Sequence, residues 1–221
     1  VMNGKMIESP KSFQVACTVM TQIIASVASS QYGGQSVDIR HLGKYLRKSY
    51  EKFKKSIKET SGGNIDDETL ERLTNERLRY ELKGGVQTIQ YQINTLMTTN
   101  GQSPFLSVFM YLNETDEYKD ELAMLIEEFI HQRIQGMKNR TGHYVTQAFP
   151  KLLYVLEEDN IHEGSKYWYL TKLAAQCTAK RMVPDYISEK IMKKLKDGNC
   201  YPCMGCRSFL SPWKDENGNY K

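Results

Sequence analysis

The sequence predicts a mixed α/β fold in which parallel strands alternate with helices and the N-terminal half is rich in helix. Short apolar segments at 105–112 and 151–156 have the length of buried strands, and helical periodicity follows each of them. Strands joined through helices of this length usually lie parallel in one sheet. The first hundred residues are predicted to be almost entirely helical, which is unusual for such a fold and indicates a separate surface there.

The composition is that of an ordinary globular protein. The 221 residues are 40% hydrophobic and 25% charged, with a formal net charge of +4. A charge this small favours phosphate-bearing ligands but does not by itself predict nucleic-acid binding. The uncharged segment 12–37 contains Gln, Thr and Ser throughout, so we interpret it as a buried helix and not as a membrane span. The N-terminus lacks the apolar segment of a signal peptide, and we expect the chain to be a central piece of a longer protein.

The first predicted helix begins at Ser9 and Pro10, because a hydroxyl residue followed by proline is typical of a helix start. Apolar residues recur at helical spacing from Phe13 to Val27 and cover much of the circumference. Such a helix needs packing partners on more than one side. Gly33–Gly34 is expected to end it.

Two further helices are predicted in the N-terminal half. The helix at 36–59 carries lysines and an arginine between residues 44 and 55, and this basic run is either a solvated face or a surface that attracts phosphates. Asn64 is expected to cap the next helix, whose early acidic residues suit its positive end. Gly84–Gly85 is expected to interrupt or kink that helix before its apolar period resumes.

The remaining elements alternate between strand and helix. Asn100–Gly101 is expected to turn the chain before the first strand, and Asp116 to begin an amphipathic helix. Beyond the strand at 151–156, the sequence predicts a helix at 167–179, an extended segment at 182–185 and a helix at 187–195.

Three of the five cysteines, Cys200, Cys203 and Cys206, lie in one short loop segment. Their spacing fits metal or cluster ligation, but neither Cys17 nor Cys177 belongs to a paired ligand motif, so the fourth ligand is missing. The alternative is a redox or radical thiol at a loop tip. An odd, crowded set of cysteines does not predict a secreted disulfide framework, and we expect a reducing cytoplasm. The four histidines are scattered, and no P-loop or GxGxxG pattern is present.

The motif Met204-Gly-Cys-Arg-Ser-Phe-Leu210 resembles the finger loop of the anaerobic (class III) ribonucleoside-triphosphate reductases, which are glycyl-radical enzymes. Five further segments resemble that family in the same order along the chain. They are Ala28–Ser36, Gly85–Thr95, Thr98–Phe105, Phe149–Leu152 and Cys177–Asp185.

The resemblance implies a fold, an activity and a set of partners. The fold would be part of a ten-stranded α/β barrel, and the activity the reduction of ribonucleoside triphosphates by thiyl-radical chemistry. Deoxynucleoside triphosphates and ATP are the implied effectors, formate the implied reductant, and a radical-SAM enzyme the implied activator of a homodimer. The glycyl radical and a structural zinc site of the family would lie outside this chain, so we expect the chain alone to be inactive. No nucleic-acid or membrane partner is implied.

The same resemblance assigns roles around the cysteine loop. Cys206 would be the catalytic cysteine, whose thiyl radical removes a hydrogen atom from C3′ of the ribose. Gly205 would allow a tight turn before it, and Met204 would point into the site beside the substrate. Arg207 would pair with a phosphate or an acid at the base of the loop.

Nucleotide control would involve the segment that links the third helix to the first strand. Asn100, Gln102 and Ser103 would carry the signal from a bound effector to the substrate base, although an ordinary helix-to-strand turn explains the same residues. Gln31 and Tyr32, at the end of the first helix, are candidates for effector contact where two chains meet. A glycine-rich helix end is the plainer explanation for that pair.

We therefore divide the chain into a helix-rich dimer and effector region, 8–98, and a region of barrel strands, helices and finger loop, 99–221. The alternative function is a metal- or cluster-binding assembly module that uses Cys200, Cys203 and Cys206. Another glycyl-radical enzyme with a different substrate is a third possibility, which the segments Ser30–Gly34 and Asn100–Phe105 disfavour.

Overall fold

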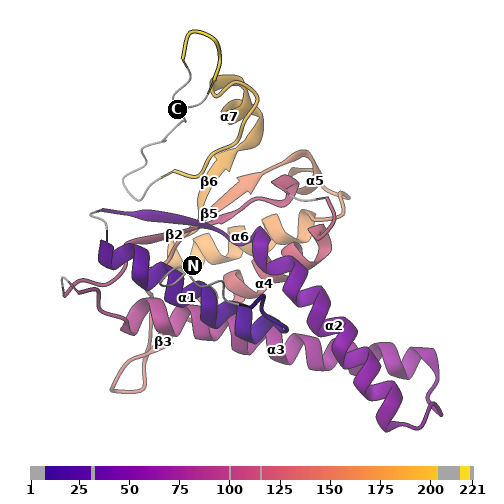
Figure 1. Ribbon diagram of the computed structural model, residues 1–221. Helices are drawn as coiled ribbons and strands as arrows, with labels where there is room; N and C mark the ends of the chain where they lie inside the picture. The colour runs from indigo at the N-terminus through magenta and orange to yellow at the C-terminus, as the bar shows by residue number, and fades with distance from the viewer. Residues whose placement is uncertain (1–7, 31–32, 100, 115, 204–214, 220–221) are drawn as a thin grey trace.

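The computed structural model describes residues 8–30, 33–99, 101–114, 116–203 and 215–219 (Figure 1). Its main sheet has four parallel strands in the order β1-β2-β5-β6. Val37 lies opposite Val108, which in turn lies opposite Leu152. A two-stranded antiparallel hairpin, β3–β4, lies apart from this sheet. The strands are β1 (Gln35–Asp38), β2 (Leu106–Met110), β3 (Met137–Lys138), β4 (Tyr144–Val145), β5 (Lys151–Leu156) and β6 (Asp185–Ser188).

The large helices cover one face of this sheet. The main core joins them to the strand residues Leu106, Val108, Met110, Leu152 and Tyr154. Figure 1 shows α1, α3, α4 and α6 on one side of the sheet and α7 on the other. The helices are α1 (Phe13–Ser30), α2 (Arg40–Thr60), α3 (Asp67–Thr95), α4 (Lys119–Gln135), α5 (Glu158–Ile161), α6 (Trp168–Arg181), α7 (Glu189–Leu195) and the 3₁₀ turn η1 (Leu112–Glu114).

The opposite face of the sheet, which we call the inner face, is covered by α7 and the segment after it. This second core consists of Phe109, Tyr111, Leu153, Val155, Ile187, Met192, Cys200 and Cys203. The strand order follows the chain order, and the long crossover helices all lie on one side. Right-handed crossovers in a single direction build the wall of a barrel, whereas a doubly wound sheet places helices on both faces. The predicted α/β class with parallel strands is confirmed.

β1 corrects the prediction of a helix from residue 36. Residues 35–38 pair with β2, and the backbone N–H of Gln35 donates to the carbonyl of Phe105 at 2.9 Å. The helix α2 begins only at Arg40, after the strand ends. The local sequence lacks the length of a typical strand, and only its pairing with a distant segment makes it extended.

The cap predicted at Asn64 is also wrong. Asp66 caps α3, and its carboxylate accepts a hydrogen bond from the backbone N–H of Thr69 at 2.8 Å. Ser188 likewise caps α7, so the last helix begins at Glu189, two residues later than predicted. The extended segment predicted at 182–185 lies further along, because Met182 ends α6 in a left-handed conformation with φ of 60°.

Gly84–Gly85 does not interrupt α3, which runs unbroken for 29 residues. Gly85 serves close packing instead, because a β-carbon there would lie 2.3 Å from the ring of Phe13 and 3.0 Å from the sulfur of Cys17. The glycine therefore lets α1 approach α3 closely, and the two helices share the main core.

The wide apolar stripe predicted for α1 is only partly covered. Phe13, Cys17 and Ile24 are buried in the core, whereas Val15, Ile23 and Val27 are exposed. By length and composition α1 would also suit a membrane span, but its buried stripe packs as in the core helix of a globular domain. We call the residues Val15, Ile23 and Val27 the open face of α1.

Candidate functional site

The cysteine segment approaches the inner face of the sheet. Cys200 and Cys203 are both buried in the second core, against strand residues such as Phe109 and Leu153. The hydroxyl of Ser36 in β1 donates to the carbonyl of Cys203 at 3.2 Å, which ties this segment to the edge strand. The chain thus reaches residue 203 on the side of the sheet that no crossover helix covers. The predicted loop residues that follow, Met204, Gly205, Cys206 and Arg207, lie outside the described residues.

A polar network lies at the carboxyl ends of the strands that face this segment. Tyr111, just after β2, donates its phenolic hydrogen to Glu189, just after β6, at 2.5 Å. The Asn113 amide and the Lys193 ammonium donate to the same carboxylate at 3.2 and 2.7 Å. Burial opposes ionisation of Glu189, but these hydrogen bonds outweigh it and leave the pKa of Glu189 below its usual value. Burial and the contact with Glu189 raise the pKa of Tyr111.

Glu157 is the buried centre of this network. Its two oxygens accept the backbone N–H groups of Leu112 and Asn113 at 2.8 and 2.7 Å, so it joins the end of β5 to the end of β2. The backbone N–H of Glu157 in turn donates to the side-chain oxygen of Asn160 at 2.9 Å. Burial raises the pKa of Glu157 to about 7, and the nearby Glu189 carboxylate acts in the same direction.

This network was not predicted from the sequence. Lys119 extends it, donating to the side-chain oxygen of Asn113 at 2.5 Å and pairing with Asp159. A usable signal was present, since Tyr111, Glu157 and Glu189 each follow a strand directly. Side chains at the carboxyl ends of parallel strands converge on one edge of the sheet.

The segment that links α3 to β2, for which a role in nucleotide control is predicted, lies against the end of α1. The chain turns here, because the N–H of Thr98 donates to the carbonyl of Gln102 at 2.8 Å and the N–H of Gly101 donates to the carbonyl of Thr98 at 2.9 Å. The N–H and hydroxyl of Thr99 both donate to Ser29 at 3.4 Å. Gln102 and Ser103 are exposed beside this contact. Asn100, Gln31 and Tyr32 lie outside the described residues.

A second contact holds the same two regions together. A β-carbon on Gly34 would lie 2.8 Å from the ring of Phe105, so the chain after α1 packs closely on the start of β2. The side-chain amide of Gln35 donates to the backbone carbonyl of Ile24 in α1 at 3.2 Å. The end of α1, β1 and the segment before β2 are therefore neighbours in space.

The basic run of α2 is largely paired with acidic or aromatic groups. Arg47 forms a two-pronged ion pair with Glu121, at 2.5 and 2.8 Å. Lys54 pairs with Glu71 at 3.0 Å, and Lys44 lies over the ring of Tyr45. These contacts favour the solvated-face interpretation of the run over a phosphate site.

No group of three His, Cys, Asp or Glu side chains that could hold a metal ion occurs in the described part of the chain. Cys17 is buried between α1 and α3, and burial raises its thiol pKa, as burial also does for Cys177. Both thiols are inert core residues. Cys206, the third member of the crowded trio, lies outside the described residues.

Comparison with known proteins matches the whole chain to one family. A sequence model of the family described as anaerobic ribonucleoside-triphosphate reductase matches residues 1–221. The chain is 36% identical to the anaerobic ribonucleoside-triphosphate reductase of Enterobacteria phage T4, covering 99% of this chain and 35% of that protein. It is also 36% identical to the protein of that name from Escherichia coli K12, covering 98% of this chain and 29% of the other. The chain thus spans about a third of the length of these relatives.

A solved structure shares the fold at much lower sequence identity. The anaerobic ribonucleotide reductase from Thermotoga maritima, crystallised with dATP and CTP, is 14% identical and superposes with a TM-score of 0.54. The match covers 85% of this chain and 30% of that protein. Likeness at this identity concerns the fold, and it agrees with the one-sided arrangement of helices around parallel strands.

Proposed function

The chain belongs to the family of anaerobic ribonucleoside-triphosphate reductases, and we propose that it forms the central part of a protein that reduces ribonucleoside triphosphates to 2′-deoxyribonucleoside triphosphates. The observation that carries this proposal is the match of the family over residues 1–221 together with identities of 36% over almost the whole chain. Because the chain spans only a third of its relatives, the activity belongs to the whole protein.

In this proposal Cys206 carries the thiyl radical that removes a hydrogen atom from the ribose. Its thiyl radical takes the hydrogen atom from C3′, so that an S–H bond forms, the C3′–H bond breaks and the unpaired electron moves to the sugar. The 2′-hydroxyl can then leave as water, with the proton that the 3′-hydroxyl gives up as C3′ becomes a carbonyl and the unpaired electron moves to C2′. Gly205 provides the tight turn before Cys206, Met204 lies beside the substrate, and Arg207 pairs with a phosphate or an acid at the base of the loop.

The described residues before the loop support this assignment. Cys203 is buried on the inner face, and the face itself is apolar, with Phe109, Leu153 and Val155 fully or almost fully buried. A radical thiol needs a site from which water and oxidants are excluded. A loop that leaves Cys203 on this face starts in such an environment. Cys200 and Cys203 act as packing residues in this proposal and have no catalytic role.

We propose nucleotide control at the joint between α1 and the segment 98–105. Thr99 contacts Ser29 there, which supports a shared role for Gln31 and Tyr32 on one side and Asn100, Gln102 and Ser103 on the other. A deoxynucleoside triphosphate or ATP bound at the end of α1 would move this turn and thereby favour one substrate base. The region 8–98 would serve effector binding and dimer contact, and the region 99–221 the barrel and finger loop.

The open face of α1 is the proposed contact between two copies of the chain. Ile23 and Val27 are exposed on a helix whose opposite stripe is packed in the core. Apolar side chains grouped on one helix face favour association with a matching face. In a two-fold dimer the end of α1 would lie near its partner, so effector contacts could come from both chains.

The chemistry that starts and completes the reaction is proposed to reside outside this chain. The components that we place outside this chain are a glycyl radical, a radical-SAM activating enzyme, formate as reductant and a structural zinc site. The isolated chain would then be inactive. We place the whole protein in a reducing cytoplasm. Any nucleotide reduction by the isolated chain would contradict this division.

The deciding experiment is formate-dependent reduction of CTP by the full-length protein, activated without oxygen. Cys206→Ser is expected to abolish deoxynucleotide formation, while Cys203→Ser, a matched change in the same segment, keeps it. Activity retained in Cys206→Ser would move the radical thiol elsewhere. Metal analysis of the wild type and of both variants adds a second readout. A stoichiometric ion that the wild type binds and both variants lose would favour a metal-binding module instead.

A further inference from the structure

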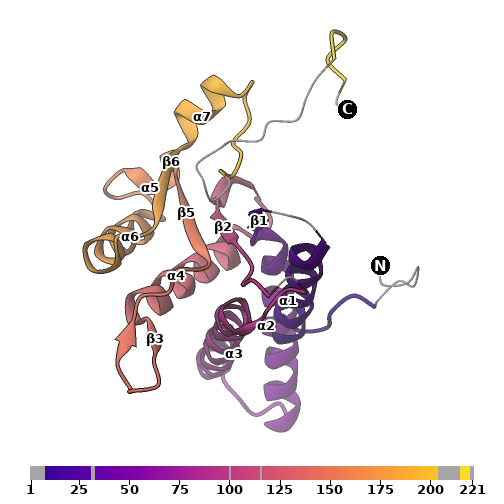
Figure 2. The ribbon, with the colours of Figure 1, turned by 90° about the vertical axis from the view of Figure 1, so that its left-hand side faces the viewer.

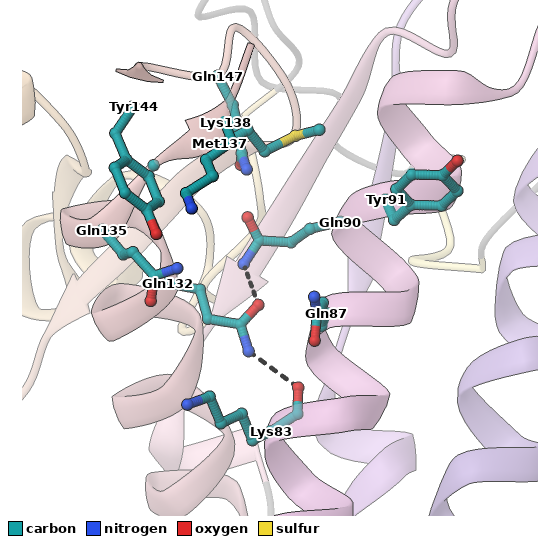
Figure 3. A pocket seen from close by; sticks show the side chains of 11 residues that line it. Lys83, Gln87, Gln90, Tyr91, Gln132, Gln135, Met137, Lys138, Tyr144 and Gln147 are labelled. Carbon is teal, nitrogen blue, oxygen red and sulfur yellow. Dashed lines mark hydrogen bonds between the residues drawn. The ribbon is translucent and has the colours of Figure 1, made fainter. Parts of the chain in front are cut away.

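A polar pocket of about 400 Å³ lies between α3, α4 and the β3–β4 hairpin (Figure 3). This volume is within the range of small-molecule sites. It lies on the helix-covered side of the sheet, whereas Cys203 is buried on the inner face. Side chains from three separate elements converge on it. The polar and charged ones are Lys83, Gln87, Gln90, Gln132, Gln135, Lys138 and Gln147.

The orientation of the central amides is fixed by the hydrogen-bond acceptors around them. The Gln132 amide nitrogen donates to the backbone carbonyl of Lys83 at 2.9 Å and to the Glu128 carboxylate at 2.6 Å. Both of these groups only accept, so the Gln132 oxygen must face Gln90, whose amide nitrogen donates to it at 3.2 Å. Figure 3 shows this chain of amides along the pocket. The Gln90 side-chain oxygen is consequently left as an acceptor.

That acceptor has no partner. Gln90 is 3% exposed and Gln147 is 8% exposed, and the side-chain oxygen of each is buried without a hydrogen bond. The backbone of Gln147 is itself held in place, because its carbonyl accepts from the buried guanidinium of Arg133 at 3.0 Å. A buried acceptor without a partner costs about 1–3 kcal/mol, so it indicates an absent donor. Two such oxygens in one pocket predict a ligand with at least two N–H or O–H groups.

The charge of the lining selects an anionic ligand. Two lysines, Lys83 and Lys138, line the pocket, and no acidic side chain does. Neither lysine forms an ion pair with any residue that the structure describes, and Lys138 lies over the ring of Tyr144, 5.4 Å from its centre. The nearest carboxylate along the amide chain, Glu128, is already engaged with Gln132.

The hairpin wall of the pocket depends on one glycine. Gly136 ends α4 with φ of 82°, and a β-carbon there would lie 2.5 Å from the carbonyl of Val145. Only glycine combines this conformation with so close an approach. The turn places Lys138 and Tyr144 beside Gln135, facing α3 across the pocket (Figure 3).

We propose that this pocket binds an organic phosphate of the size of a nucleoside monophosphate. Its hydroxyl or amino groups would donate to the Gln90 and Gln147 oxygens, and its phosphate would lie between Lys83 and Lys138. This assignment does not depend on the nucleotide-reducing function, because it rests on side chains remote from the cysteine segment.

The test is titration calorimetry of the full-length protein with AMP, with adenosine and inorganic phosphate as separate probes. In the presence of AMP, hydrogen–deuterium exchange should slow in peptides that cover 83–91 and 132–147. Gln90→Met should weaken AMP binding about tenfold, which corresponds to ~1.4 kcal/mol for a hydrogen bond with one partner buried. Lys138→Gln, an exposed change that leaves the fold intact, should weaken it roughly fivefold and reduce its salt dependence.

Matched controls are Gln176→Met and Lys58→Gln, which change the same residue types on exposed surfaces of α6 and α2 and should leave AMP binding unchanged. Three results would overturn the proposal. One is the absence of AMP binding, and another is binding of inorganic phosphate as tight as that of AMP. The third is AMP binding that neither pocket variant weakens, or that slows hydrogen exchange only in peptides outside 83–91 and 132–147.

Discussion

Gly85 of α3 lies directly beneath the ring of Phe13 of α1, so close that a β-carbon would overlap a ring carbon at 2.3 Å. Gly84, the preceding residue, has only the amide oxygen of Gln14 near the same position, at 3.6 Å. The two glycines have identical local sequence properties but different surroundings. Gly85 is a packing residue, and Gly84 is a residue on the helix surface.

Replacing each glycine by alanine should therefore have opposite effects on stability. Gly85→Ala forces α1 away from α3 and is expected to lower the free energy of unfolding by about 1–3 kcal/mol, the usual cost of overpacking. Gly84→Ala should raise it by roughly 0.5–1 kcal/mol, because alanine is the better helix former. Urea unfolding of both variants measures the difference. Equal effects in the two variants would contradict the close contact between the helices.

Glu157 should make stability depend on pH between its ordinary pKa near 4.5 and its folded pKa of about 7. A carboxyl group with a raised pKa holds its proton more tightly in the folded chain than in the unfolded chain. The free energy of unfolding should therefore fall as the pH rises through this window, by about 3 kcal/mol at 1.36 kcal/mol per pKa unit. Below pH 4.5 this contribution is fully present.

The measurement is urea unfolding at several pH values for the wild type, Glu157→Gln and Glu158→Gln. Glu157→Gln removes the titrating group, so its stability should decline less than that of the wild type over this window. Glu158→Gln changes the exposed neighbouring carboxylate and should keep the wild-type slope. Parallel curves for all three proteins would show that Glu157 does not titrate there.

Sequence reasoning reached the elements whose signals are local. The strand at 151–156 and the buried stripe around Ile126 and Phe129 were predicted because length and periodicity identify them. It failed at β1, where four partly exposed residues become a strand only through pairing with a segment far along the chain. It failed again at Gly85, because no local pattern tells a packing glycine from a helix-breaking one.

The site was predictable in the same uneven way. The cysteine loop has a recognisable motif, so its residues could be named from the sequence alone. The carboxyl-end network could not, since Tyr111 and Glu189 meet only when β2 and β6 are placed in one sheet. The pocket lined by Gln90 and Gln132 likewise depends on three elements, α3, α4 and the β3–β4 hairpin, that the fold brings together.

The open face of α1 should control association of the chain. Ile23→Asp places a charge in the proposed contact and is expected to shift the protein from dimer to monomer, because an interfacial charge without a partner is costly. Ile191→Asp is the matched control, since Ile191 on α7 is exposed to a similar extent, 53% against 58% for Ile23. Sedimentation equilibrium gives the dissociation constants. A dimer unaffected by Ile23→Asp would place the contact on another surface.

Gln102 is expected to transmit the effector signal in the full-length protein. Gln102→Ala should leave the overall rate of nucleotide reduction similar but remove the change in preferred base that each effector causes. The readout is the ratio of deoxynucleotide products from an equal mixture of substrates, with and without each effector. Gln176→Ala, an exposed change on α6, should retain the wild-type pattern. Unchanged preference in Gln102→Ala would remove this residue from the signal path.

The pairing of β1 with β2 also sets the order in which the chain can fold. These neighbours in the sheet are separated by residues 39–105, which contain all of α2 and α3. Closing so long a loop is entropically unfavourable until those helices have already collapsed against each other. The first edge of the sheet should thus be among the last parts to acquire amide protection during refolding. The Ser36 contact that anchors the cysteine segment would form only after that step.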